Sequence, residues 1–220
     1  MTADLIFLIL SLFSWGIGEG MLMYFQPLYL QQWGADPRMI GIVYGALGVS
    51  MMITQIPAGI LADKIGARPI MRLSWVLGLA ACLVMASAGT IELFIFGMIF
   101  YGFTAFGVTP MNSYITHVRG RLSAERALTF VSAGFNSGAV LGPILGGVIA
   151  QYYGIQQIYL IACGIFVVST GLLFFIRKQA ALSEEDRLGK PKLHQNPRFI
   201  ALLPIVFLTV FALYLPQPLI

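Results

Sequence analysis

Charged residues are scarce in this chain of 220 residues: Asp, Glu, Lys and Arg make up 10% of it, whereas 58% is hydrophobic. A soluble domain carries about 25% charged residues, so the low share excludes a water-soluble globular protein. Residues 39–62, 73–91 and 127–176 contain no charged side chain at all. A helix needs about 20 apolar residues to cross the ~30 Å hydrocarbon layer of a membrane. The missing charge therefore predicts several membrane-spanning helices, with membrane lipid as a partner.

Cysteine and histidine are also rare, with two of each. Cys82 and Cys163 lie deep in apolar runs without the short spacing of a metal site, so we expect small buried side chains rather than a disulfide or a ligand pair. The chain has no Ser/His/Asp set and no phosphate-binding loop. We therefore expect no metal, no cofactor and no enzymatic activity.

The basic residues are few and grouped. Twelve of the thirteen Lys and Arg residues fall in three clusters, at 64–72, 119–126 and 177–198, which follow alternate apolar runs. This is the distribution that the positive-inside rule describes. The net charge of +4 then reports orientation rather than nucleic-acid binding, with a basic patch against anionic lipid as the lesser alternative. We expect a multi-pass protein of the cell inner (plasma) membrane with a cytoplasmic N-terminus.

The apolar runs predict seven spans. Their expected limits are about 5–30, 39–62, 70–88, 92–117 with a kink near Pro110, two spans within 127–176, and 199–220. The fifty uncharged residues from 127 to 176 would measure about 75 Å as one helix, so an outer turn is expected at 151–157. Residues 177–198 are polar and charged, which is typical of a cytoplasmic linker.

The sequence GILADKIGAR at residues 59–68 forms a charged turn between two uncharged runs. Such a turn belongs at the membrane surface, because unpaired backbone groups are not tolerated in lipid. We expect Asp63 to end the second span and Gly66 to let the chain reverse, while the basic side chains meet lipid headgroups.

This turn resembles the loop between spans 2 and 3 of the major facilitator superfamily, whose pattern is Gly-x-Leu-Ala-Asp-Arg/Lys-x-Gly-Arg-Arg/Lys. Ala67 stands where that family usually has a basic residue. The resemblance implies that the acid of the turn latches the cytoplasmic ends of two transporter halves together. The candidate conformational-switch residues are Gly59, Asp63, Lys64, Gly66 and Arg68.

Glycines recur every four residues in the fifth expected span, at Gly134, Gly138, Gly142 and Gly146. This spacing places them on one bare helix face, which suits close packing against a neighbouring helix. The segment GAVLGPILGG at 138–147 also resembles a Gly-x-x-x-Gly-Pro-x-x-Gly-Gly motif of the antiporter branches, chiefly drug exporters, of the same superfamily. Its remaining motif residues are Pro143 and Gly147. The resemblance implies efflux by antiport, although packing alone would account for the glycines.

Glu19 lies within the first expected span, where an ionised side chain is costly unless it faces a cavity or is protonated. On a helix, one face about 80° wide carries four polar and aromatic residues: Ser11, Trp15, Glu19 and Gln26. We interpret this stripe as the wall of a cavity, with Glu19 as a proton carrier or a cation-binding carboxylate. The alternative is a structural acid that is hydrogen-bonded within the bundle.

Three further polar residues are candidates for the substrate and proton pathway, or for contacts between helices: Tyr101, Asn112 and Asn136. The drug exporters usually carry an Arg where this chain has Met98, and a Gln where it has Tyr101. The resemblance therefore does not extend to their usual proton-coupling residues.

A short internal repeat supports two similar halves. The sequence YFQPL at 24–28 resembles LPQPL at 215–219, 191 residues later, and parallel repeats are how such transporters are built. We expect an all-α integral membrane protein with a six-helix N-terminal half at 1–176, a linker at 177–198 and, at 199–220, the first helix of a missing C-terminal half. The chain end within an apolar run favours a truncation.

The favoured function is secondary transport of a small solute by alternating access, with protons as a candidate coupling ion and the C-terminal half required for a complete transporter. A truncated, non-transporting membrane protein is the main alternative. A membrane enzyme that uses Glu19 and His117 is disfavoured, because the two residues are expected at different depths.

Overall fold

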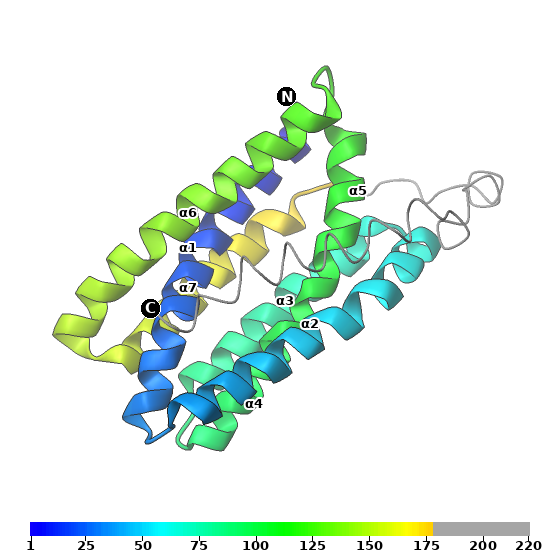
Figure 1. Cartoon of the computed structure of the whole chain (residues 1–220). Coiled ribbons are helices and arrows are strands. Elements are labelled where there is room, and N and C mark those ends of the chain that lie inside the picture. Colours follow the sequence, from blue (N-terminus) through cyan, green and yellow to red (C-terminus); the bar gives the residue numbers. More distant parts are fainter. Residues whose placement is uncertain (178–220) are drawn as a thin grey trace. The chain divides into compact units, whose positions relative to one another are not determined.

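The computed structural model describes residues 1–177; the expected linker from 178 onward and the span at 199–220 lie outside the described residues. The described elements, shown in Figure 1, are the helices α1 (Ala3–Gln32), α2 (Pro37–Ile65), α3 (Ala67–Ala86), α4 (Ile91–Gly102), the 3₁₀ helix η1 (Phe103–Gly107), α5 (Val108–Val118), α6 (Ala124–Tyr153) and α7 (Ile155–Phe174). Elements α4, η1 and α5 form one span, so six spans in this region are long and apolar enough to cross a membrane. The predicted all-α membrane fold is confirmed.

Polar residues begin four of the spans. The side chains of Thr2, Asp36, Thr90 and Ser123 each accept a hydrogen bond from the backbone N–H three residues later. This satisfies a donor that the helix itself leaves unpaired. The spans therefore start at the short polar connections that separate the apolar runs.

Two glycines end helices and reverse the chain. Gly66 follows α2 with φ 91°, and Gly154 follows α6 with φ 87°, a backbone conformation that is open mainly to glycine. The expected reversal at Gly66 is confirmed, and Gly154 lies within the expected outer turn. The expectation that Asp63 ends the second span is wrong, because α2 continues to Ile65. The helix stops only where the backbone reaches the glycine.

The fourth span changes its helical geometry at η1, directly before the turn that contains Pro110. Proline has no N–H to donate, and its ring clashes with the carbonyl four residues earlier, which here belongs to Phe106. The expected kink near Pro110 therefore takes the form of a tighter 3₁₀ segment just N-terminal to the proline.

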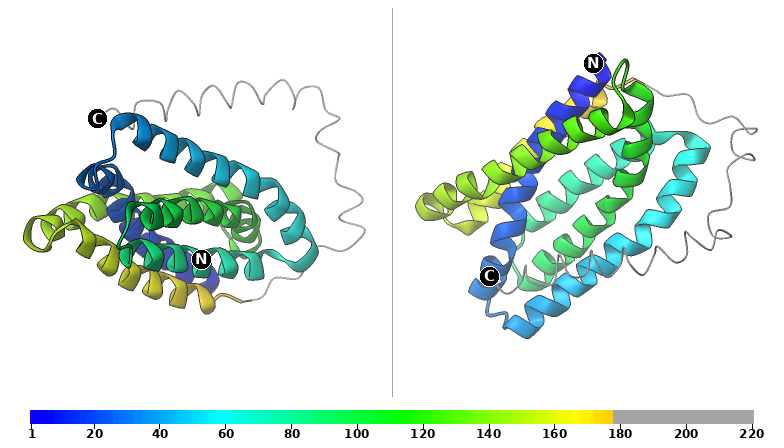
Figure 2. Two further views of the ribbon diagram at one scale, coloured as in Figure 1. Left: turned by 90° about the horizontal axis from the view of Figure 1, so that it is seen from below. Right: turned by 45° about the horizontal axis from the view of Figure 1, so that its top comes forward.

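Helix α1 organises the bundle by packing along both α6 and α7, while α3 packs against α7 and α4. Helix α2 packs against η1, α4 and α5. In Figure 2, α2 runs along the opposite side of the bundle from α6. The space between these two sides is where the candidate site lies.

The glycine face of α6 packs directly on α1. A Cβ atom on Gly134 would lie 2.9 Å from Ile9 Cγ2, and one on Gly146 would lie 2.7 Å from Phe25 Cε2. Between them, Cβ atoms on Gly138 and Gly142 would collide with the backbone of α1. Helix α1 also has glycines at this contact: Gly16 and Gly20 face the backbone of α6 in the same way. Glycine on both helices lets the two backbones approach this closely.

Candidate functional site

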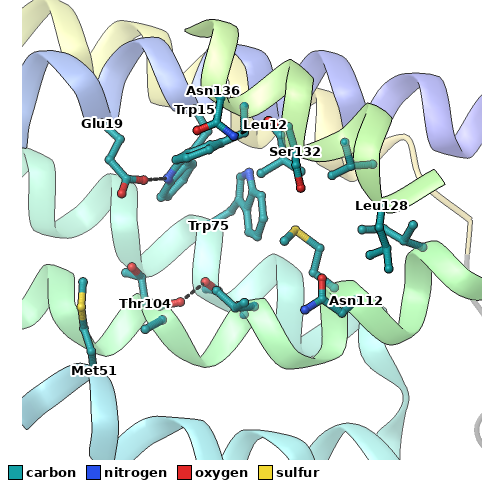
Figure 3. A pocket seen from close by; sticks show the side chains of 18 of the residues that line it. Leu12, Trp15, Glu19, Met51, Trp75, Thr104, Asn112, Leu128, Ser132 and Asn136 are labelled. Atoms are coloured by element: carbon teal, nitrogen blue, oxygen red, sulfur yellow. Dashed lines mark hydrogen bonds between the residues drawn. The ribbon is translucent and has the colours of Figure 1, made fainter. Parts of the chain in front are cut away.

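A cavity of about 380 Å³ lies within the bundle, lined by residues from every described element except α7. Figure 3 shows Trp15 and Glu19 on one wall and Met51 of α2 across from them. Five of the expected pathway residues line this cavity: Trp15, Glu19, Tyr101, Asn112 and Asn136. The fold therefore brings residues of α1, α4, α5 and α6 together around one space.

The Glu19 carboxylate is held by two aromatic donors. Trp15 donates from Nε1 to Glu19 Oε2 over 2.8 Å, one turn earlier on the same helix. Tyr101 donates from its hydroxyl to the same oxygen over 3.1 Å, from the end of α4. Glu19 remains half-buried at the cavity wall. Within residues 1–177, neither group that hydrogen-bonds Glu19 is cationic, so the carboxylate can still take up a proton or a cation.

Aromatic rings surround this carboxylate. The Trp15 ring lies 5.0 Å from Trp75, 4.3 Å from Phe166 and 6.2 Å from Tyr101, measured between centroids. Packed aromatic pairs of this kind stabilise one another by about 0.5–1.5 kcal/mol beyond their buried area. The cluster forms an aromatic wall beside one acidic group.

Asn112 and Asn136 add two amides to the cavity lining. Asn112 comes from α5 and Asn136 from α6, and both side chains are exposed. Asn136 donates from Nδ2 to the Ser132 carbonyl over 2.7 Å. These amides add polar hydrogen-bonding groups to a largely apolar lining (Figure 3).

Gln26, also expected on the pathway, does not line this cavity. Its side chain is fully buried; Oε1 accepts a hydrogen bond from the Tyr44 hydroxyl over 3.3 Å, and Nε2 lies 3.9 Å from Met85 Sδ. Gln26 thus connects α1 to α2 and α3. Both of these polar contacts join helices.

Ser11 has a similar position at the other end of the stripe. Its hydroxyl donates to the Ser169 carbonyl over 2.8 Å, and Trp75 donates from Nε1 to both serine hydroxyls over 3.1 Å. The stripe on α1 therefore reaches the cavity only in its central part, where Trp15 and Glu19 lie.

Trp75 and Gln55 are among the residues of the cavity wall that sequence reasoning missed. Trp75 lines the cavity from α3; a tryptophan inside an uncharged run was the available signal. Gln55 lines it from α2 and accepts a hydrogen bond from Thr109 of α5 over 3.0 Å. It was the only side chain with an amide in the second span, and could have been found in that way.

Residues 8–219 match the family model described as the Major Facilitator Superfamily. The chain belongs to this superfamily. Because the family consists of transporters, the expectation that the chain is not an enzyme is confirmed. Glu19 and His117, the disfavoured catalytic pair, lie apart: Glu19 is near the middle of α1, and His117 is in the last turn of α5.

Several proteins of this superfamily are similar to the chain. The multidrug resistance protein MdtG of Rahnella sp. (strain Y9602) is 30% identical over 202 residues, which cover 87% of the chain and 49% of that protein. MdtG of Salmonella paratyphi A is 29% identical over 212 residues, covering 91% and 52%. An uncharacterized MFS-type transporter of Methanocaldococcus jannaschii is 24% identical over 179 residues, covering 81% and 46%.

A solved structure shares the fold. The crystal structure of a mutant of the peptide transporter POT in complex with sulfate matches with a TM-score of 0.70 at 17% identity, over 98% of this chain and 47% of that one. The chain thus spans about half the length of the relatives that it matches.

The two span-4 positions at which the resemblance to the drug exporters fails are both buried. Met98, at the position of the exporters' Arg, is fully buried in the core. Tyr101, at the position of their Gln, donates to Glu19. In this chain the acid and the phenol face each other without a basic residue between them.

The superfamily turn lies at one end of the bundle. Asp63 and Lys64 are in the last turn of α2, and Arg68 is in the first turn of α3. Gly59 faces α5, since a Cβ there would lie 3.7 Å from Thr109 Cγ2. The turn therefore joins the helix that carries Gln55 to the helix that carries Trp75.

Proposed function

We propose that this chain is the N-terminal half of a secondary transporter that moves a small solute across the membrane by alternating access. In this proposal residues 1–176 form the six-helix half, 177–198 the linker, and 199–220 the first helix of a C-terminal half that completes the cavity. Family membership supports the mechanism, because such transporters bind solute near the membrane midplane between two repeats.

The observation that carries the proposal is the acidic, aromatic cavity at the middle of the helices. Glu19 lines it together with Trp15, Trp75 and Tyr101. An intramembrane acid marks a substrate or ion pathway by default, and aromatic faces attract cations. The preferred solute is a small molecule with an apolar body and a cationic group.

The proposed coupling is competition at Glu19 between a proton and the solute cation. A carboxylate that binds one of them in each orientation of the transporter exchanges proton entry for solute exit. The MdtG relatives are multidrug resistance proteins, and the segment 138–147 carries the motif of the antiporter branches. Both favour efflux over uptake.

The turn at 59–68 is the proposed conformational switch. Gly59, Asp63, Lys64, Gly66 and Arg68 would connect this half to its partner at the cytoplasmic surface and favour one orientation of the cavity. Asp63 is the charged group of the latch, since a carboxylate can accept strong hydrogen bonds from a basic side chain or a helix N-terminus.

The test is transport of a fluorescent lipophilic cation by the full-length protein in proteoliposomes with an imposed pH gradient. Glu19→Gln keeps size and hydrogen bonding but removes ionisation. We expect it to abolish gradient-driven transport of the cation and to weaken cation binding by about tenfold or more. Glu92→Gln is the matched control, because Glu92 is exposed in the first turn of α4 and does not line the cavity.

Unchanged transport and binding in Glu19→Gln would reject both roles of the acid and leave a structural carboxylic acid. If the Glu19→Gln variant still exchanges solute in the absence of a gradient, Glu19 acts in coupling and not in solute binding. The coding sequence beyond Ile220 tests the division into halves: a continuation of about 170 residues fits two repeats. A stop codon there would favour the non-transporting alternative.

A further inference from the structure

The chain's two cysteines meet inside the bundle, although they lie 81 residues apart. Cys82 on α3 and Cys163 on α7 are both free thiols, and their sulfur atoms are 2.9 Å apart. Cys82 also donates to the Tyr159 carbonyl over 3.4 Å. Sequence analysis expected two separate buried side chains; the structure shows two buried thiols that contact each other.

The surroundings restrict what this pair can do. Among the residues that the structure describes, no third His, Cys, Asp or Glu completes a metal site, and zinc needs four ligands. Cys82 is fully buried and Cys163 is 5% exposed, so the sulfurs have little room for an inserted ion. A disulfide needs no added atom: the sulfurs would approach from 2.9 Å to about 2.05 Å.

We propose that Cys82 and Cys163 are an oxidisable pair, and that a lipid-soluble quinone converts them into a disulfide tying α3 to α7. The two S–H bonds break and one S–S bond forms. Two electrons and two protons pass to the quinone, which leaves as the quinol. The product is neutral, as a group within the membrane should be.

A quinone fits this position better than an aqueous oxidant. Both thiols lie within spans, where a charged reagent would have to enter hydrocarbon. Cys163 retains the accessible surface, and the next residue, Gly164, is exposed with nothing within 4 Å of a Cβ placed there. In this proposal the quinone approaches the Cys163 thiol from the lipid. The fully buried Cys82 thiol then forms the S–S bond with Cys163.

The test uses the whole chain in native membranes, treated with a fully methylated benzoquinone, whose substituted ring carbons do not add thiols. The chain is then denatured in the presence of a thiol-blocking reagent, so that every free thiol reacts, and the blocked thiols are counted by mass. Because the chain has two cysteines, an intramolecular disulfide identifies both partners. We expect both thiols to disappear, with loss of two hydrogens, unchanged monomer size and full recovery after dithiothreitol.

Two variants control for proximity. Cys163→Ser should keep its remaining thiol through the same treatment. The double variant Cys163→Ser/Gly164→Cys keeps two thiols but turns one by about 100° around α7, and its oxidation should be at least tenfold slower. Gly164 has open space, so this variant is expected to fold; its elution on gel filtration is compared with that of the parent chain.

Two blocked thiols after quinone treatment of the folded chain would overturn the proposal, as would a disulfide-linked dimer in place of the internal bond. Equal oxidation rates in the double variant and the parent would also overturn it, because contact between the sulfurs would then be irrelevant. If phenylarsine oxide protects both thiols while the quinone leaves them reduced, the pair captures thiophilic metalloids instead.

Discussion

Tyr101 at the end of α4 donates a hydrogen bond to Glu19 near the middle of α1, over 3.1 Å between the phenol oxygen and Oε2. The two residues are 82 positions apart, and the contact connects the two helices across the cavity wall. Trp15 donates to the same oxygen and stacks on the Tyr101 ring. The acid is therefore positioned by groups that also shape the apolar wall.

Tyr101→Phe should lower the free energy of unfolding in detergent by about 1–2 kcal/mol, because one hydrogen bond to an acidic group is lost while the ring remains. In a double-mutant cycle, most of this loss should vanish when Glu19 is already Ala. Tyr114→Phe is the matched control, since the Tyr114 hydroxyl donates to the Arg177 carbonyl instead. Equal coupling of both tyrosines to Glu19 would contradict the geometry.

Gly138→Leu should destabilise the bundle by at least about 3 kcal/mol, because the added side chain forces the α1 and α6 backbones apart. Gly147→Leu, on the same helix, should cost less than about 0.5 kcal/mol, since a Cβ at Gly147 meets nothing within 4 Å. The stabilities of the two variants are compared through their melting temperatures in the same detergent. Similar melting of both variants would mean that α6 does not pack on α1 through this face.

Asp63→Asn should leave insertion unchanged but slow transport by the full-length protein about tenfold, because in the proposed mechanism one end state loses its charged latch. The reversal of the chain persists, since Gly66 with φ 91° provides it. Asp36→Asn is the control: Asp36 caps the start of α2, a role that Asn fills equally well. Transport at the wild-type rate in Asp63→Asn would reduce the motif to a surface turn.

Orientation is tested by single cysteines in a chain whose Cys82 and Cys163 are replaced by Ala. A cysteine at Arg121 should react only with reagent on the cytoplasmic side, and one at Gln32 only with reagent outside, as the basic clusters predict. Both positions are exposed. The same experiment at Lys190, outside the described residues, tests the expected linker. Labelling of Arg121 from outside would reverse the predicted topology.

The sequence alone was sufficient for the six spans within residues 1–177 and for the approximate places of their turns, because these depend on local properties. A long uncharged run is stable in lipid as a helix. Gly66 was expected to reverse the chain, and the turn at 151–157 was expected because 50 residues are too long for one span. Family membership followed from local motifs as well. The limits of α2 were missed by a few residues, because a helix can continue through charged residues at a membrane surface.

Which faces meet was decided only by the tertiary structure. The glycines of α6 predicted a closely packed neighbouring helix, but only the structure shows that this neighbour is α1, through Gly16 and Gly20. The stripe on α1 looked continuous, yet Glu19 lines the cavity while Gln26 is buried against Tyr44. Periodicity gives the face of a single helix, whereas the partner of that face depends on crossing angles and on side chains of other helices. For the same reason, no spacing in the sequence could predict the contact between Cys82 and Cys163.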